Sequence, residues 1–142
     1  MKKSEVDHIL RAAGRITGER QSHTAWLNAI GQDSKFHEQF GYYADPVDEA
    51  SATLPKGWKG RLVNLPSGDT EGVSGLCLDP HDLAIAKYAA CREKDLIFMR
   101  GLISHGIVAR DRLEMLLEKT HLPQEKREQM RQQIARDFGA SK

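Results

Sequence analysis

Residues 75–103, GLCLDPHDLAIAKYAACREKDLIFMRGLI, are the stretch that decides the fold. Asp79 is placed to cap a helix, Pro80 fits the first helical position, and Asp82 adds negative charge to the first turn. At about 100° per residue, apolar side chains fall on two opposite sides of this helix. The first side holds Leu83, Ala86, Ala90, Ile97 and Gly101, and the second holds Ile85, Tyr88, Leu96, Met99 and Ile103. The pattern predicts one long central helix, or two helices in series, packed on both sides.

Two polar strips lie between these apolar sides. Asp82, Glu93 and Arg100 form one strip, whose mixed charges and wide spacing are typical of a solvated edge. The other strip holds Lys87, Cys91, Lys94, Asp95 and Phe98. Its lysines have two interpretations. They either extend to solvent and pair with nearby acids, or they face a bound phosphate or nucleotide.

The run HDLAIAKYAACREKDLIF, residues 81–98, resembles part of a family of small bacterial nucleotidyltransferase-like proteins of the polymerase-beta-type superfamily. The similarity extends through FHEQFGYYADPV, ATLPKGWKGRLV and GVSGLCLDPHDLA, and through the N-terminal helix to about Gln21. In such proteins a helical lysine is followed by an R-x-K-D segment. The resemblance therefore implies nucleotide binding by four residues: Lys87, Arg92, Lys94 and Asp95.

The catalytic signature of that superfamily is missing from this chain. The signature is a Gly-Ser turn after a buried strand, followed on the next strand by an Asp-x-Asp or Asp-x-Glu pair. Such carboxylates hold the divalent cations that bridge the nucleotide phosphates. Here there is no Gly-Ser dipeptide, and Gln21 runs directly into Ser22 where the family has two apolar strands. The sequence therefore predicts no catalytic residue and no metal ligand.

Other acidic pairs with the required one-residue gap do not replace the signature. These are Glu5 with Asp7, Asp69 with Glu71, and Glu93 with Asp95. The first and third pairs fall in expected helices, where residues two apart point about 200° apart. The second pair lies in a polar, glycine-rich turn, SGDTEG, which we expect to hold a cation loosely at most.

Length and composition set the general class. At 142 residues we expect a single domain over 1–142, with a nucleotidyltransferase-like region at 1–121 and a C-terminal helix at 122–142. A net charge of +1 gives no general attraction to nucleic acid or to a membrane. No signal peptide, membrane-spanning run or zinc pattern is found, and Cys77 and Cys91 are expected to be reduced. We therefore expect a cytoplasmic protein.

The rest of the chain predicts an α+β fold, mostly helical with a small sheet, as a truncated nucleotidyltransferase-like fold. Helices are expected at 4–14, 22–32, 111–119 and 124–138, and strands near 40–43, 50–54, 61–65 and 73–78. His8 is expected to be exposed or to face a partner, and His37 to be packed and hydrogen-bonded. The basic residues of the last helix alternate with acids, which favours a solvated helix over a nucleic-acid surface; they are Lys126, Arg127, Arg131 and Arg136.

Three functions stay open at this point. The first is a shortened nucleotidyltransferase-like protein without catalysis, which binds a nucleotide poorly or not at all. Its remaining use is to bind a protein partner or a second copy through edges exposed by the missing strands. The second is an active enzyme that uses magnesium and a nucleoside triphosphate, with carboxylates supplied from elsewhere. The third is a helical scaffold without a ligand. The resemblance also associates such proteins with toxin–antitoxin pairs.

Overall fold

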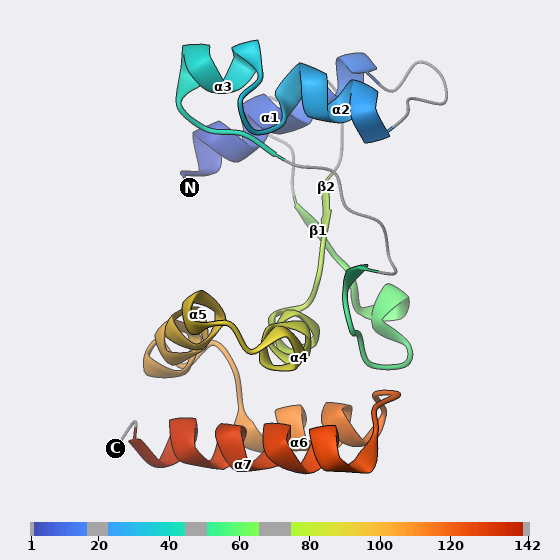
Figure 1. Cartoon of the computed structure of the whole chain (residues 1–142), viewed down its shortest axis with the longest axis vertical. Helices are drawn as coiled ribbons and strands as arrows, with labels where there is room; N and C mark the ends of the chain where they lie inside the picture. Colours follow the sequence, from blue (N-terminus) through green and yellow to red (C-terminus); the bar gives the residue numbers. More distant parts are fainter. Residues whose placement is uncertain (1, 17–22, 45–50, 66–74, 141–142) are drawn as a thin grey trace. The chain divides into compact units, whose positions relative to one another are not determined.

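The computed structural model describes residues 2–16, 23–44, 51–65 and 75–140 (Figure 1). Their contacts separate into two compact units. Unit 1 comprises Met1–Ser51 and Asn64–Leu76, and unit 2 comprises Ala52–Val63 and Cys77–Lys142. Each unit is described by itself, and a single domain over the whole chain stays a prediction.

The described part of unit 1 contains the helices α1 (Lys3–Ile16), α2 (His23–Ile30) and α3 (Lys35–Phe40). The expected strand near 40–43 is wrong at Phe40, which ends α3. Ser34 caps that helix by accepting a hydrogen bond from the His37 amide, and Gly41 ends it at φ 78°. The local cap therefore outweighs the strand preference of the aromatic residues.

Four rings of unit 1 form an aromatic cluster: His8, Phe36, Phe40 and Tyr42. His8 Nδ1 lies 2.5 Å from the Tyr42 hydroxyl, so this histidine is half-buried and partnered within unit 1. Of the two expectations for His8, exposure is wrong, because its aromatic partners lie far along the chain, and contact with a partner protein stays a prediction. His37 is half-buried and accepts a hydrogen bond from the Asp33 amide, as expected.

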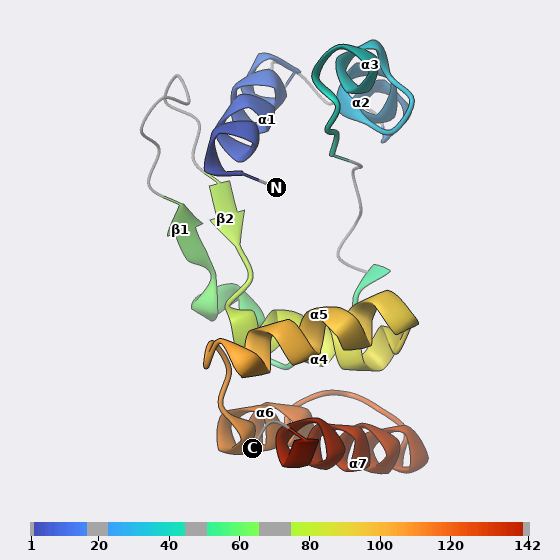
Figure 2. The same cartoon turned by 90° about the vertical axis from the view of Figure 1, so that its left-hand side faces the viewer.

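The strands β1 (Val63–Leu65) and β2 (Gly75–Cys77) pair in a two-stranded antiparallel sheet (Figure 2). Both strands lie inside the ranges expected from the sequence. The expected strand at 50–54 is wrong over its described residues, 51–54, which pair with no strand there. The α+β class, mostly helical with a small sheet, is confirmed.

The stretch that decides the fold contains two helices in series, α4 (Pro80–Ala90) and α5 (Glu93–Ser104). The cap is confirmed, since Asp79 accepts a hydrogen bond of 2.9 Å from the His81 amide. Cys91 ends α4 in the left-handed conformation, at φ 52°. Because this break changes the direction of the apolar stripe, Ile97 is 56% exposed instead of buried.

Helices α6 (Arg110–Glu118) and α7 (Gln124–Ala140) form a second layer against α4 and α5 (Figures 1 and 2). The core between the layers includes Ile85, Tyr88, Met99, Leu113, Leu116, Leu117, Met130 and Ile134. In α7, Met130 and Ile134 are buried and Phe138 is partly buried, so a narrow stripe at positions i, i+4 and i+8 faces the core. No described helix is long and apolar enough to span a membrane.

Asp82 does not lie on a solvated edge, contrary to the sequence prediction. Its side chain is fully buried in α4 and accepts two hydrogen bonds from Arg61, at 2.9 and 2.7 Å. Arg61 belongs to a short 3-10 helix, η2 (Trp58–Arg61). The error arises because helical periodicity contains no information about a partner from a distant segment.

Candidate functional site

The four predicted nucleotide-binding residues surround the break between α4 and α5, which we call the α4–α5 corner (Lys87, Arg92, Lys94 and Asp95). Lys87 comes from the last turn of α4. Arg92 is the N-cap of α5, and the Asp95 side chain completes a capping box with it. The break at Cys91 therefore brings the end of one helix to the start of the next.

Asp95 is the centre of this corner. One carboxylate oxygen, Oδ2, accepts hydrogen bonds from Arg92 Nε at 2.7 Å and from the Arg92 amide at 3.2 Å. The other, Oδ1, lies 3.3 Å from both Lys87 Nζ and Arg92 Nη2. The hydrogen bond from the Arg92 side chain lowers the pKa of Asp95 to about 2, against the effect of burial. Asp95 is therefore ionised at neutral pH, with both oxygens engaged.

The two cations that hold Asp95 remain accessible from solvent. The Asp95 side chain is 1% exposed, whereas that of Lys87 is 31% and that of Arg92 is 56% exposed. Lys87 Nζ also lies 5.5 Å from the centre of the Phe98 ring. The lysine thus pairs with an acid across the helix break rather than one turn away on its own helix.

Lys94 is exposed, and no ion pair links it to another described residue. The structure therefore brings Lys87, Arg92 and Asp95 into contact and leaves Lys94 beside them on the first turn of α5. Glu93 is also exposed in this turn. The corner itself has three cations and one acid, a net charge of +2, which becomes +1 when the neighbouring Glu93 is counted.

A pocket of about 250 Å³ adjoins the corner at Cys91. It is lined by Tyr88, Cys91, Lys126, Gln129, Met130, Gln133 and Arg136. The sequence predicts a solvated position for Lys126 and Arg136, and in the structure both residues line this pocket. Sequence reasoning missed this pocket because α7 meets the end of α4 through tertiary packing alone. Its volume suits part of a ligand rather than a whole nucleotide.

No group of three or more His, Cys, Asp or Glu residues in the described part of the chain is arranged to hold a metal ion. The loose cation turn at Asp69 and Glu71 and the junction at Gln21 and Ser22 lie outside the described residues. Cys77 and Cys91 are free thiols, both exposed. The corner thus offers cationic donors, and Asp95 cannot bind a metal without giving up Lys87 or Arg92.

Comparison with protein families matches residues 15–140 to a family described as "Nucleotidyltransferase of unknown function (DUF6036)". The match confirms the nucleotidyltransferase-like resemblance on which the four site residues were chosen. Comparison with curated proteins and with solved structures gives no significant match to this chain.

Proposed function

This chain belongs to the family of nucleotidyltransferases of unknown function, and we propose that it binds a nucleoside triphosphate at the α4–α5 corner without transferring the nucleotidyl group. Lys87, Arg92 and Lys94 contact the phosphates. Asp95 holds the first two in position from the buried side and does not touch the ligand.

One observation carries this proposal: a buried carboxylate fixes two cations whose outer sides reach solvent. Each cation has more donors than Asp95 uses, since an ammonium has three and a guanidinium has five. The remaining donors are held in place before a ligand arrives, which lowers the entropy lost on binding. Lys94 is exposed and forms no ion pair with another described residue, so it adds positive charge to the corner without holding another side chain in place.

The absence of transfer follows from the missing carboxylate pair. Two-metal catalysis of nucleotidyl transfer needs paired acids that hold the cations beside the phosphates. The sequence has no Gly-Ser turn with a following Asp-x-Asp pair, and Asp95 is occupied. Binding without chemistry is the role that remains for the cations.

Isothermal titration with ATP in the presence of magnesium tests the binding. Saturable binding is expected for the wild type, with a clear loss of affinity in Lys87→Gln and Lys94→Gln. Lys35→Gln is the matched control. Lys35 is exposed and lies in unit 1, and its substitution removes the same charge as the corner substitutions do. Wild-type affinity in both corner variants, or no binding by the wild type, would contradict the proposal.

Active transfer is the alternative, and the description of the family supports it. It requires carboxylates from a partner chain together with magnesium and a nucleoside triphosphate. Incubation with labelled triphosphates separates the two functions. Labelled product that forms only with magnesium would show that the chain transfers the nucleotidyl group. Unchanged triphosphate would support binding alone.

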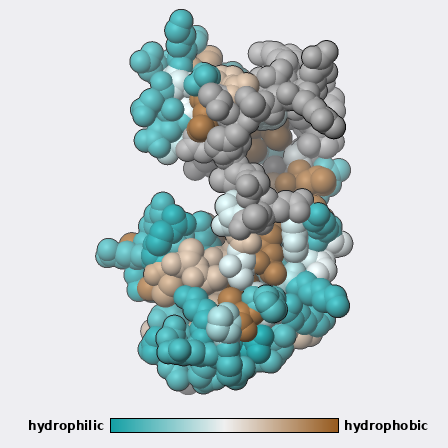
Figure 3. All heavy atoms as spheres, turned by 45° about the vertical axis from the view of Figure 1, so that its right-hand side comes forward, coloured by the Kyte–Doolittle hydropathy of each residue, from teal (hydrophilic) through white to brown (hydrophobic). Residues whose placement is uncertain are grey.

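A protein partner or a second copy of the chain is a further proposal, and so are a cytoplasmic location and membership in a toxin–antitoxin pair. On the face in Figure 3, hydrophilic residues predominate over the described part of unit 2. Exposed apolar side chains of unit 2 include Ile97, Phe98, Ile107 and Met115. Light scattering on the purified chain distinguishes a monomer from an oligomer.

A further inference from the structure

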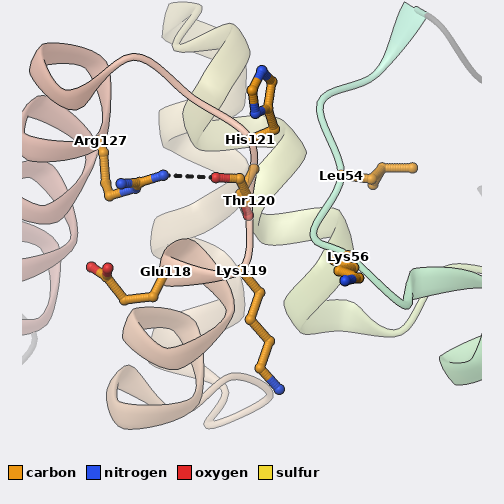
Figure 4. Close-up of a pocket in the computed structure, with 7 residues that line it drawn as sticks. All are labelled: Leu54, Lys56, Glu118, Lys119, Thr120, His121 and Arg127. Carbon is orange, nitrogen blue, oxygen red and sulfur yellow. Dashed lines mark hydrogen bonds between the residues drawn. The ribbon is translucent and has the colours of Figure 1, made fainter.

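We propose that unit 2 has a second anion site, separate from the α4–α5 corner, which binds a small ligand carrying several phosphate groups. The site is a pocket of about 520 Å³ between the segment before η2 and the turn that joins α6 to α7 (Figure 4). We call it the basic pocket; it is lined by Leu54, Lys56, Glu118, Lys119, Thr120, His121 and Arg127.

The lining residues carry excess positive charge. Lys56, Lys119 and Arg127 give three cations against one acid, so the lining has a net charge of +2 with His121 neutral. That exceeds the net charge of the whole chain, which is +1. The acid, Glu118, pairs with Arg131, which does not line the pocket. In Figure 4, Glu118 and Lys119 leave the turn in different directions.

Several donors of the basic pocket are available to a ligand. Among the residues that the structure describes, neither Lys56 Nζ nor Lys119 Nζ forms an ion pair. Arg127 donates from Nη2 to the Thr120 carbonyl at 3.0 Å, as Figure 4 shows. Its Nε is buried and has no hydrogen-bond partner within the described chain. Because this Nε is shielded from solvent, it is not among the donors offered to a ligand, which are the two lysine ammoniums.

The walls of the basic pocket are held by hydrogen bonds. The Lys56 amide donates to the Lys119 carbonyl at 2.9 Å, which fixes the two lysines on adjacent segments. Thr120 is buried and its hydroxyl donates to the Leu116 carbonyl at 2.8 Å. These bonds fix the backbone from which the Lys56 and Lys119 side chains extend.

The spread of the cations favours a ligand with more than one phosphate. The two lysines belong to different segments, and Arg127 comes from α7. In Figure 4, Lys119 and His121 extend in opposite directions from the turn. Because the cations come from three segments, a ligand with several phosphate groups can contact more of them than a single phosphate can. The volume lies in the range of about 300–1,000 Å³ that is usual for small-ligand sites.

Nuclear magnetic resonance titration of the full chain with inorganic tripolyphosphate at low salt tests the basic pocket. The amide signals of Lys56, Lys119 and Thr120 are expected to shift with saturation. In the double variant Lys56→Gln/Lys119→Gln the dissociation constant should rise at least about tenfold, because two phosphate contacts are lost. Both side chains are exposed, so the remaining spectrum should be retained.

The control is Lys35→Gln/Arg100→Gln, which removes two exposed charges outside both proposed sites and should bind like the wild type. The amides of 92–95 report the α4–α5 corner separately, so failure of one site is distinguishable from failure of the other. The basic pocket is refuted if its three amides do not respond, or if the pocket variant and the control variant bind equally well.

Discussion

The phenol of Tyr88 donates a hydrogen bond of 2.8 Å to the buried carboxylate of Asp137, which ties α4 to α7. Gln133 donates to the other oxygen of this carboxylate, also at 2.8 Å. Burial, followed by the hydrogen bond to Asp137, raises the pKa of Tyr88. The Tyr88 phenol therefore keeps its proton over the whole pH range in which proteins are usually studied, and it continues to donate to Asp137.

Tyr88→Phe should lower the free energy of unfolding by about 1–3 kcal/mol, since a buried carboxylate loses a hydrogen bond. The ring and its packing are retained, so the loss reports the hydroxyl. Urea unfolding at neutral pH measures the change. Tyr43→Phe is the control, because that side chain is 36% exposed and should alter stability by less than about 0.5 kcal/mol. Equal stability of the two variants would contradict a role for the bond.

Arg61→Ala should destabilise the chain by about 3 kcal/mol, because it leaves the buried Asp82 carboxylate without its cation. Arg61→Lys keeps the charge but not the two-pronged geometry, and should cost about half as much. Arg110→Ala is the matched control. Its pair with Glu114 is largely exposed and should contribute less than about 1 kcal/mol. Urea unfolding that ranks Arg110→Ala with Arg61→Ala would disprove this assignment.

The sequence predicts local features of the fold well. The cap at Asp79 and the two last helices of unit 2 follow from spacing and from residue types along one segment. The errors occur where a distant segment decides the outcome. Arg61 reaches Asp82 from 21 residues away, and Tyr88 reaches Asp137 from 49 residues away, so no periodic pattern contains either pair.

In the candidate site, too, the sequence predicts what one segment determines and misses what depends on packing. The resemblance selected Lys87, Arg92, Lys94 and Asp95, and three of these residues are in contact. It did not indicate that Asp95 would be buried beneath the cations, because that depends on the break at Cys91. A Gly or Asn residue, which adopts the left-handed conformation more readily, would have marked the break more clearly than the cysteine does. The basic pocket has no local signal, since its lysines meet only through a backbone hydrogen bond.

Asp95 should make the free energy of unfolding depend on pH in the acid range. Its pKa is about 2 in the folded chain and about 3.9 when unfolded. Protonation therefore favours the unfolded state, and the contribution of Asp95 is present above about pH 4 and is lost as the pH falls towards 2. Asp95→Asn should lower the free energy of unfolding at neutral pH by about 1–2 kcal/mol, through the weakened cap and ion pairs.

Urea unfolding of both proteins between pH 7 and pH 2 measures this dependence. The wild type should lose more stability than Asp95→Asn over the acid range, so that the two curves converge near pH 2. Other carboxylates titrate in both proteins and cancel in the difference. Parallel curves would show that Asp95 does not have the low pKa that its contact with Arg92 implies.

Substitutions of Lys87 and Lys94 distinguish a structural role from ligand binding at the α4–α5 corner. Lys87→Gln should weaken both stability and ATP affinity, because Lys87 pairs with the buried Asp95. Lys94→Gln should leave the free energy of unfolding within about 0.5 kcal/mol of the wild type, since Lys94 is exposed, and should still reduce ATP affinity. Each lost phosphate contact should also reduce the dependence of affinity on salt. If Lys94→Gln binds ATP as tightly as the wild type at low salt, the ligand contacts only the cations held by Asp95, and the corner is smaller than proposed.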